Sequence, residues 1–364
     1  MTDATSKTRR TSGAGLGLVQ SIALAGALFA ATAGAVAQTA PVSIAGILGV
    51  DPTALKTMMA GYARPSDIPS PEHNPTTADK VKLGKMLFFD PRLSGSGAIS
   101  CATCHNPSLG WQDGLPTAVG DKGGILGRHT PTILNAAWME PLFWDGRANT
   151  LEEQALGPIM AQAEMAGSPK KVLETLNNVQ FYREEMARVF PHEPLSLETA
   201  AKAIAAYERT VVSGEAPFDR WIKGNDAAIS DSAKRGFVLF NTKGNCAVCH
   251  AGWRFADDGF HDIGLPGNDM GRAAVLPGIV QLERAFKTPT LRNIAERGPY
   301  MHDGSIATLE GVVDHYDESF VRRPSLDAEM KSLKLTDQEK ADIVAFMKTL
   351  SSDDAPVDMP ILPR

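Results

Sequence analysis

The feature that most constrains this chain is a five-residue pattern, Cys-x-x-Cys-His, which occurs twice, at 101–105 and 246–250. The four cysteines of these two copies are all that the chain contains. A histidine directly after the second cysteine distinguishes the pattern from a bare redox or zinc Cys-x-x-Cys and is typical of a c-type haem attachment site. The thiols form thioethers to the porphyrin edge, and the histidine ligates the iron. We therefore predict two covalently bound haem c groups, one held by Cys101, Cys104 and His105 and the other by Cys246, Cys249 and His250.

The first 37 residues have the features of a secretory signal peptide. Basic residues stand at positions 7, 9 and 10, an apolar run follows over 16–35, and Ala-Val-Ala at 35–37 offers a cleavage site. We predict cleavage after residue 37 and export to the periplasm, where c-type haem is attached. The alternative is a retained membrane anchor, because the apolar run is nearly long enough to span a bilayer.

Composition and charge exclude several classes of function. The 364 residues are 43% hydrophobic and 21% charged, as in a globular protein that is large enough for two domains. The formal net charge is −6, and signal cleavage would remove three basic residues and one acidic residue, which changes it to −8. An acidic protein of this kind is not expected to bind nucleic acid and is suited to a basic protein partner. No stretch beyond residue 37 is long enough to span a membrane.

The second half of the chain repeats short motifs of the first half at a constant offset of 158 residues. Thr-Pro-Thr at 130–132 recurs at 288–290, the segment 141–146 aligns with 299–304, and Thr-Leu-Glu at 150–152 recurs at 308–310. Internal repetition of this kind indicates one structural unit used twice.

Helical patterns dominate the chain, and no convincing run of alternating strands occurs. Similar helices are expected over 82–88 and 234–240, just before each haem motif, and further helices over 200–212 and after a capping box at 336–339. We predict a mainly α protein with two cytochrome c-like haem domains related by pseudo-twofold duplication. The expected order is a signal peptide (1–37), a linker or N-terminal arm (38–75), a first haem domain (76–213), a second haem domain (214–352) and a C-terminal tail (353–364).

Over about residues 76–350 the chain resembles the di-haem cytochrome c peroxidase / MauG family. The resemblance rests on both haem motifs and on the strings FWDGRANTLEEQALGPIMAQAEM and TPTLRN, GPYMHDG and TLEGVVDHY. It implies an enzyme with peroxide chemistry at one haem, electron storage or transfer at the other, and a tryptophan between them. The position of that tryptophan corresponds to Trp144.

The repeat offset allows the two haem environments to be compared. Pro158 is the counterpart of Tyr316, so if the tyrosine lies over the second haem, the proline lies over the first. A phenolate ligates ferric iron, whereas proline has no donor to offer. We predict a second haem held by His250 and Tyr316 and a first haem held by His105 alone, with an open face for hydrogen peroxide. Residues 106–128 contain no histidine that could block that face.

Tyrosine at this position resembles the MauG branch of the family, whereas detoxifying peroxidases usually place methionine there. The alternatives for Tyr316 are a packing role, with Met301 or Met270 as the second iron ligand.

The resemblance also implies residues for the chemistry. Glu164 matches the family's catalytic glutamate and would move the proton during O–O cleavage, and Gln154 matches another position in the pocket. The family binds calcium through an asparagine and two backbone carbonyls. The carbonyls correspond to Arg297 and Pro299, but His129 stands at the asparagine position, and imidazole suits calcium poorly. Alternatively, His129 reaches the first haem and closes it.

Three functions remain in competition at this point. The first is a MauG-like periplasmic oxidoreductase that uses hydrogen peroxide to oxidise a protein, through a high-valent intermediate spread over both haems. The second is a cytochrome c peroxidase that reduces hydrogen peroxide to water with electrons from a small cytochrome or cupredoxin. The third is a di-haem cytochrome that only transfers electrons, and an open iron face beside Glu164 argues against it.

Overall fold

The computed structural model describes residues 49–364, which belong to a compact unit spanning Ser43–Arg364. The predicted signal peptide lies outside the described residues. Within the described part, no helix is long and apolar enough to cross a membrane.

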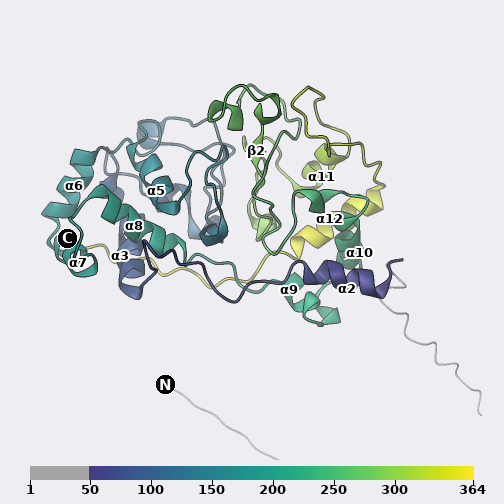
Figure 1. Ribbon diagram of the computed structural model, residues 1–364, viewed down its shortest axis with the longest axis horizontal. Helices are drawn as coiled ribbons and strands as arrows, with labels where there is room; N and C mark the ends of the chain where they lie inside the picture. Colours follow the sequence, from purple (N-terminus) through teal and green to yellow (C-terminus); the bar gives the residue numbers. More distant parts are fainter. Residues whose placement is uncertain (1–48) are drawn as a thin grey trace, which may run out of the picture. The chain divides into compact units, whose positions relative to one another are not determined.

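Short helices account for most of the regular structure of this unit, as predicted (Figure 1). The α-helices are α2 (Pro52–Ala60), α3 (Ala78–Phe89), α4 (Cys101–Cys104), α5 (Leu151–Met160), α6 (Pro169–Asn178), α7 (Gln180–Val189), α8 (Leu197–Glu208), α9 (Pro217–Ile222), α10 (Asp231–Asn241), α11 (Leu309–Asp317) and α12 (Asp337–Lys348). Three-residue 3₁₀ turns, such as η6 (Cys246–Val248), punctuate the loops. In residues 49–364, the only sheet is an antiparallel pair, β1 (Phe260–His261) and β2 (Phe286–Lys287), with Phe260 opposite Lys287.

Two equivalent helix pairs form the scaffold, α3 against α8 and α10 against α12. Gly84 of α3 lies so close to α8 that a Cβ there would overlap the carbonyl oxygen of Ala203. Gly236 of α10 meets the carbonyl oxygen of Asp342 in α12 in the same way. The first helix of each pair leads into a haem motif, so the predicted repeat is also a repeat of packing.

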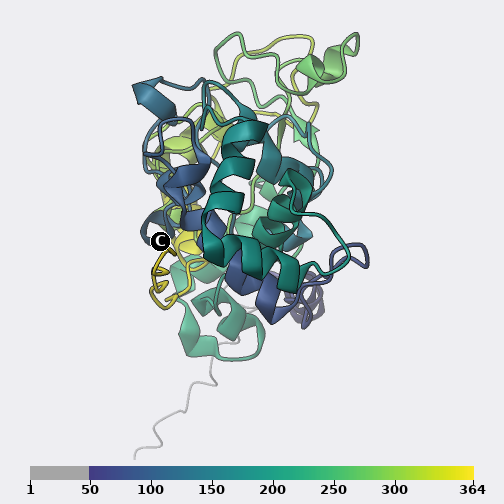
Figure 2. The ribbon, with the colours of Figure 1, turned by 90° about the vertical axis from the view of Figure 1, so that its left-hand side faces the viewer.

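Each helix pair belongs to its own hydrophobic core. The first core includes Leu83, Leu87 and Phe88 of α3 with Ala203 and Ile204 of α8. The second core includes Phe237 and Phe240 of α10 with Ile343 and Phe346 of α12. The ring of Phe346 makes edge-to-face contacts with the rings of both phenylalanines of α10. Figure 2 views the unit from the side of the first core.

The two chain ends, predicted as a linker or N-terminal arm and a C-terminal tail, both pack against the hydrophobic cores. Residues 38–75 contain α2, which begins at Pro52. The Asp51 side chain caps its first N–H groups. A capping aspartate followed by proline is a helix start that the sequence does show. Leu55 and Tyr62 pack into the second core. Val357 of the C-terminal segment packs against the first core instead, and the C-terminus lies beside α7 (Figure 1). Each end therefore contacts the core that is farther from it in the sequence.

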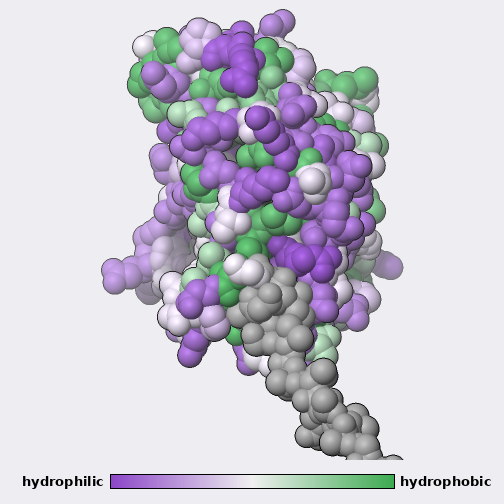
Figure 3. Space-filling view, turned by 90° about the vertical axis from the view of Figure 1, so that its right-hand side faces the viewer, coloured by the Kyte–Doolittle hydropathy of each residue, from purple (hydrophilic) through white to green (hydrophobic). Residues whose placement is uncertain are grey.

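Figure 3 shows the face of the molecule on the side of α2. Hydrophilic side chains cover most of this face, and hydrophobic side chains form small separate patches among them.

Candidate active site: two haem cavities

The first haem motif lies in the wall of a cavity of about 580 Å³. Cys101, Cys104 and His105 line this cavity, at α4 and directly after it. Most of the remaining lining is apolar and includes Ile204 of α8. Two thiols and an imidazole on one wall of an apolar cavity fit a covalently attached haem.

The second haem motif borders a smaller cavity of about 170 Å³. Cys246, Cys249 and His250 line it, together with Tyr316 of α11 and Met301. Met270 is exposed on the surface and does not line this cavity. Burial raises the pKa of the Tyr316 hydroxyl, so a nearby metal cation would be needed to hold this side chain as a phenolate.

Both motif histidines are oriented by a backbone carbonyl. His105 Nδ1 donates to the carbonyl oxygen of Trp111 at 3.2 Å, and His250 Nδ1 donates to that of Phe255 at 2.7 Å. Burial lowers the pKa of both imidazoles, which keeps them neutral. This arrangement fixes the tautomer and leaves Nε2 of each ring for iron.

Helix α5 and the loop after it carry the polar residues predicted for the first cavity. Gln154, Pro158 and Glu164 all line it. Burial raises the pKa of the Glu164 carboxyl, and the positive charge of Arg147 opposes that shift. The backbone around the carboxyl is fixed, because Asp121 N donates to the Glu164 carbonyl oxygen at 2.6 Å. The cavity thus presents a carboxyl with a raised pKa beside a proline that offers no iron ligand.

Trp144 lines both cavities. Its indole N–H donates to the carbonyl oxygen of His129 at 2.8 Å, and its own carbonyl accepts from Lys287 N at 2.8 Å. His302, its counterpart in the repeat, lies edge-on to it with a ring separation of 6.5 Å and stacks on Phe286 at 3.5 Å. Backbone contacts with both halves of the unit therefore hold the indole in the wall between the cavities.

Comparison with known proteins identifies the family to which this chain belongs. The family model for di-haem cytochrome c peroxidase matches residues 78–227, and the model for cytochrome c matches residues 233–351. Over 312 residues the chain is 50% identical to the methylamine utilization protein MauG of Methylorubrum extorquens, which covers 85% of this chain and 88% of that protein. The chain belongs to the di-haem cytochrome c peroxidase / MauG family.

Other relatives lie on both branches of this family. The cytochrome c551 peroxidase of Nitrosomonas europaea is 38% identical, over 79% of this chain and 85% of that protein. The crystal structure of a MauG-like protein associated with microbial copper homeostasis superposes with a TM-score of 0.73 at 32% identity, and covers 80% of this chain and 95% of that one. The predicted fold class and family are confirmed, and the protein is a haem-containing, peroxidase-type oxidoreductase.

The calcium ion that this family implies is poorly matched by the residues present. His129 Nδ1 donates to the carbonyl oxygen of Leu115 at 2.7 Å, so this ring does not replace an amide oxygen as a ligand. The side chain of Arg297 is buried, and its guanidinium donates to the Thr290 carbonyl at 2.6 Å. In the described part of the chain, Arg297 has no carboxylate ion-pair partner. Because position 129 offers no oxygen ligand, the residues present do not fit calcium, and we derive no step through it.

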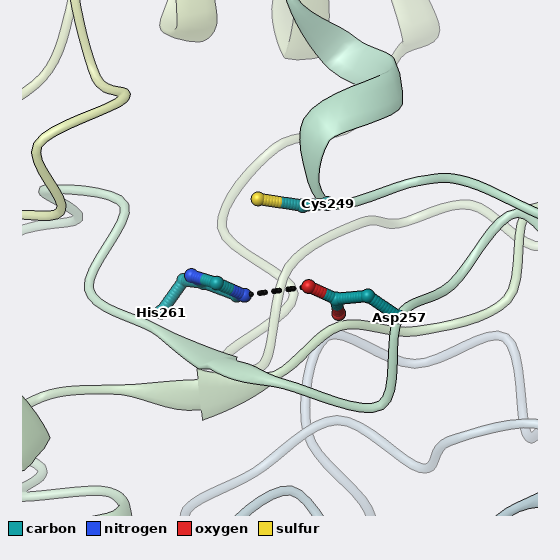
Figure 4. Close-up of side chains that lie close together, drawn as sticks. All are labelled: Cys249, Asp257 and His261. Atoms are coloured by element: carbon teal, nitrogen blue, oxygen red, sulfur yellow. Dashed lines mark hydrogen bonds and ion pairs between the residues drawn. The ribbon is translucent and has the colours of Figure 1, made fainter.

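A cluster of three polar side chains lies beside the second haem motif and was not predicted from the sequence. Figure 4 shows Cys249, Asp257 and His261 close together, with a 3.0 Å contact between His261 Nε2 and Asp257. His261 Nδ1 also contacts Asp327 at 2.7 Å. Hydrogen bonds to the Asp257 carboxylate, to Cys249 and to the Asp327 carboxylate raise the pKa of His261 above its ordinary value, which favours the cationic imidazole. Because Cys249 is committed to the porphyrin, this trio is not a metal site. Asp327 is far away in the sequence, and no local signal could have placed it here.

Glu208 is the second residue that the sequence analysis missed. It ends α8, lines the first cavity and is only 3% exposed. Burial raises the pKa of its carboxyl to about 8. In the sequence it is one of many glutamates, and only the packing of α8 distinguishes it.

Proposed function

We propose that this protein is a MauG-like oxidoreductase that uses hydrogen peroxide to oxidise a protein substrate. The observation that carries the proposal is the asymmetry of the two cavities. The first has Pro158, and its second histidine, His129, is bound through Nδ1 to the Leu115 carbonyl at 2.7 Å. The second cavity has Tyr316. An open first site would meet peroxide directly, and an anionic tyrosine ligand would stabilise an oxidised second site.

In this proposal Glu164 is the proton-transfer residue. A bound haem supplies the iron to which peroxide coordinates and the redox chemistry. The Glu164 carboxylate would accept a proton from hydrogen peroxide at one oxygen atom and return it to the other oxygen, which leaves as water. Its raised pKa brings this carboxyl closer to neutral pH, where such a group is most effective. Gln154 would donate a hydrogen bond that orients the oxidant.

Trp144 is the proposed link between the two haems. It lines both cavities, and its ring is held by the carbonyl of His129. An indole in this position connects the two π-systems and can carry an electron from one cavity to the other. Two oxidising equivalents would then be shared across the pair while the protein substrate is bound elsewhere.

The second candidate is a cytochrome c peroxidase, fed by a small cytochrome or cupredoxin. The likeness to a cytochrome c551 peroxidase supports it. Val248, between the cysteines of the second motif, is 50% exposed, which places that edge of the second site at the surface for a donor protein. In either case the partners are hydrogen peroxide and a protein.

We also propose export to the periplasm with cleavage after residue 37. The basic start, apolar run and small-residue site support it, and c-type haem attachment is a periplasmic process.

Electron paramagnetic resonance of the ferric, haem-loaded protein tests the assignment of the two sites. We expect one high-spin signal, from a haem held by His105 alone, and one low-spin signal, from a haem held by His250 and Tyr316. Two low-spin signals would exclude an open first site and with it the proposed reaction with peroxide.

A further inference from the structure

Glu208 is a buried carboxyl in the first cavity to which the proposed chemistry assigns no role. It is only 3% exposed and lines the cavity near Cys101. Among the described residues, its Oε2 atom has no hydrogen-bond partner. A buried carboxyl without partners is costly as an anion and is retained more easily when it carries a proton.

The charges around Glu208 do not neutralise it. Its neighbour Arg209 turns to Glu152 of α5 and donates to both carboxylate oxygens, at 2.8 and 3.0 Å. Arg209 and Glu152 are the charged groups that act on Glu208, with opposite signs, and Cys101 of α4 faces it from the cavity wall. The buried residues of α3 and α6, which also pack against α8, carry no charge. The protonation state of Glu208 therefore depends on its burial and on the charge of the group that occupies the cavity.

The second cavity has no carboxyl at the equivalent place. The close contacts of Gly84 with Ala203 and Tyr207 match those of Gly236 with Asp342 and Phe346, which aligns the two helix pairs residue by residue. Glu208 follows Tyr207 in α8, and Met347 follows Phe346 at the equivalent position of α12. Met347 is also buried and lines the second cavity. The two cavities therefore differ by one ionisable group at a matched position.

We propose that Glu208 couples proton uptake to electron uptake in the first cavity. When one electron from an external one-electron donor enters the cofactor there, the Glu208 carboxylate takes one proton from solvent and an O–H bond forms. When the electron leaves, that bond breaks and the proton returns to solvent. The physical reason is that a negative charge in a low-dielectric wall favours the more oxidised cofactor, so reduction favours the neutral acid.

This inference requires a haem in the first cavity and does not depend on which substrate is oxidised. It also differs from the role proposed for Glu164, because Glu208 acts on charge in the cavity and need not touch peroxide.

Redox titration of the haem-loaded protein with dye mediators between pH 6 and 9 tests the proposal. The absorbance of the high-spin and low-spin haems is followed separately. In the unaltered protein the midpoint potential of the first haem should fall as the pH rises, with a slope that approaches one proton per electron. In Glu208→Gln, which keeps the shape of the side chain, this slope should be lost. The second haem is the internal control and should be unchanged.

Two control variants make the result decisive. Glu164→Gln keeps Glu208 and should keep the slope of the first haem. Met347→Gln changes the matched position in the second cavity and should also leave the slope of the first haem unchanged. If Glu208→Gln loses haem, Glu208→Met introduces the side chain that the second cavity already tolerates. A slope that persists in the Glu208 variants, or no slope in the unaltered protein, would overturn the proposal.

Discussion

Two single residues, Pro158 and Tyr316, distinguish the two cavities most strongly. They occupy equivalent positions in the repeat, yet one has no donor atom and the other has a phenol. Near Pro158 lies Glu164, whose carboxyl has a raised pKa because it is partly desolvated. These two residues are the basis of the proposal that the first cavity receives the oxidant and that the second supplies a permanent iron ligand.

Glu164→Gln should slow the reaction with hydrogen peroxide by about 10²- to 10⁴-fold, because the amide cannot accept the proton. In the unaltered protein the rate should rise with pH as the carboxyl, with its raised pKa, becomes a carboxylate, and the variant should lack this rise. Stopped-flow absorbance measures both effects. Glu174→Gln, at an exposed position of α6, is the control and should react normally. A normal rate in Glu164→Gln would remove this residue from the mechanism.

Tyr316→Phe should keep both haems covalently attached, because the cysteines are untouched, but it should change the spectrum of the second haem. The substitution removes the hydroxyl and retains the ring that lines the cavity. Electron paramagnetic resonance should show the low-spin signal altered or converted to high-spin. An unchanged low-spin signal would mean that another residue, such as Met301, is the ligand.

At the scale of the elements, the two helix pairs hold the haem motifs in place. Their close approach depends on Gly84 and Gly236, whose missing side chains let two helices meet backbone to backbone. The same approach determines which residues of α8 and α12 reach the cavities, including Glu208 and Met347.

Gly84→Ala should destabilise the protein by about 3 kcal/mol, the upper end of the usual cost of overpacking, because the new Cβ meets backbone and not a flexible side chain. Urea unfolding of the haem-loaded protein measures this change. Gly124→Ala is the matched control, since the nearest atom to its Cβ would be 4.0 Å away, and it should change stability by no more than about 0.5 kcal/mol. Equal stabilities of the two variants would contradict the packing described for α3 and α8.

At the scale of the whole unit, hydrogen bonds hold both chain ends against the rest of the protein. Tyr62, beyond α2, donates to Asn241 of α10 at 2.8 Å, and Asp354 accepts from Gly214 N at 2.6 Å. A buried pair, Asn135 with Ser213, is repeated as Asn293 with Ser352. These contacts tie the segments between and after the repeats to the loops that surround the cavities.

Chelation should leave the protein unchanged, because His129 stands where the family has an oxygen ligand for calcium, and its Nδ1 atom is bound to the Leu115 carbonyl. After dialysis against a calcium chelator, the spectra of both haems and the ratio of high-spin to low-spin signal should equal those of the untreated protein. Metal analysis should find clearly less than one calcium per chain. Stoichiometric calcium, or spectra that change on chelation and recover when calcium is added, would contradict this expectation.

The two haem domains could be predicted because short motifs of the first half recur in the second half at a constant offset in the sequence. Trp144, Pro158, Glu164 and Tyr316 were placed by that offset and by motif, and all of them line the expected cavities. Glu208 could not be placed in this way. It corresponds to Met347 through an offset of 139 residues, since the segment between the repeats has a different length.

Contacts between distant segments escaped prediction for a similar reason. Asp327 approaches His261 only through the folded chain. Tyr62 joins the second core, where it contacts Asn241, which is 179 positions away in the sequence. Local pattern reveals a helix or a motif, but it does not reveal which distant loop will pack against it.

The most direct test of the central claim is to add hydrogen peroxide to the fully ferric, haem-loaded protein without any reductant. We expect an immediate reaction at the first haem and a long-lived absorbance change that involves both haems, since the proposal has an open first site that Trp144 connects to the second. No change until one haem has first been reduced would contradict an open first site and would favour a cytochrome c peroxidase that needs activation.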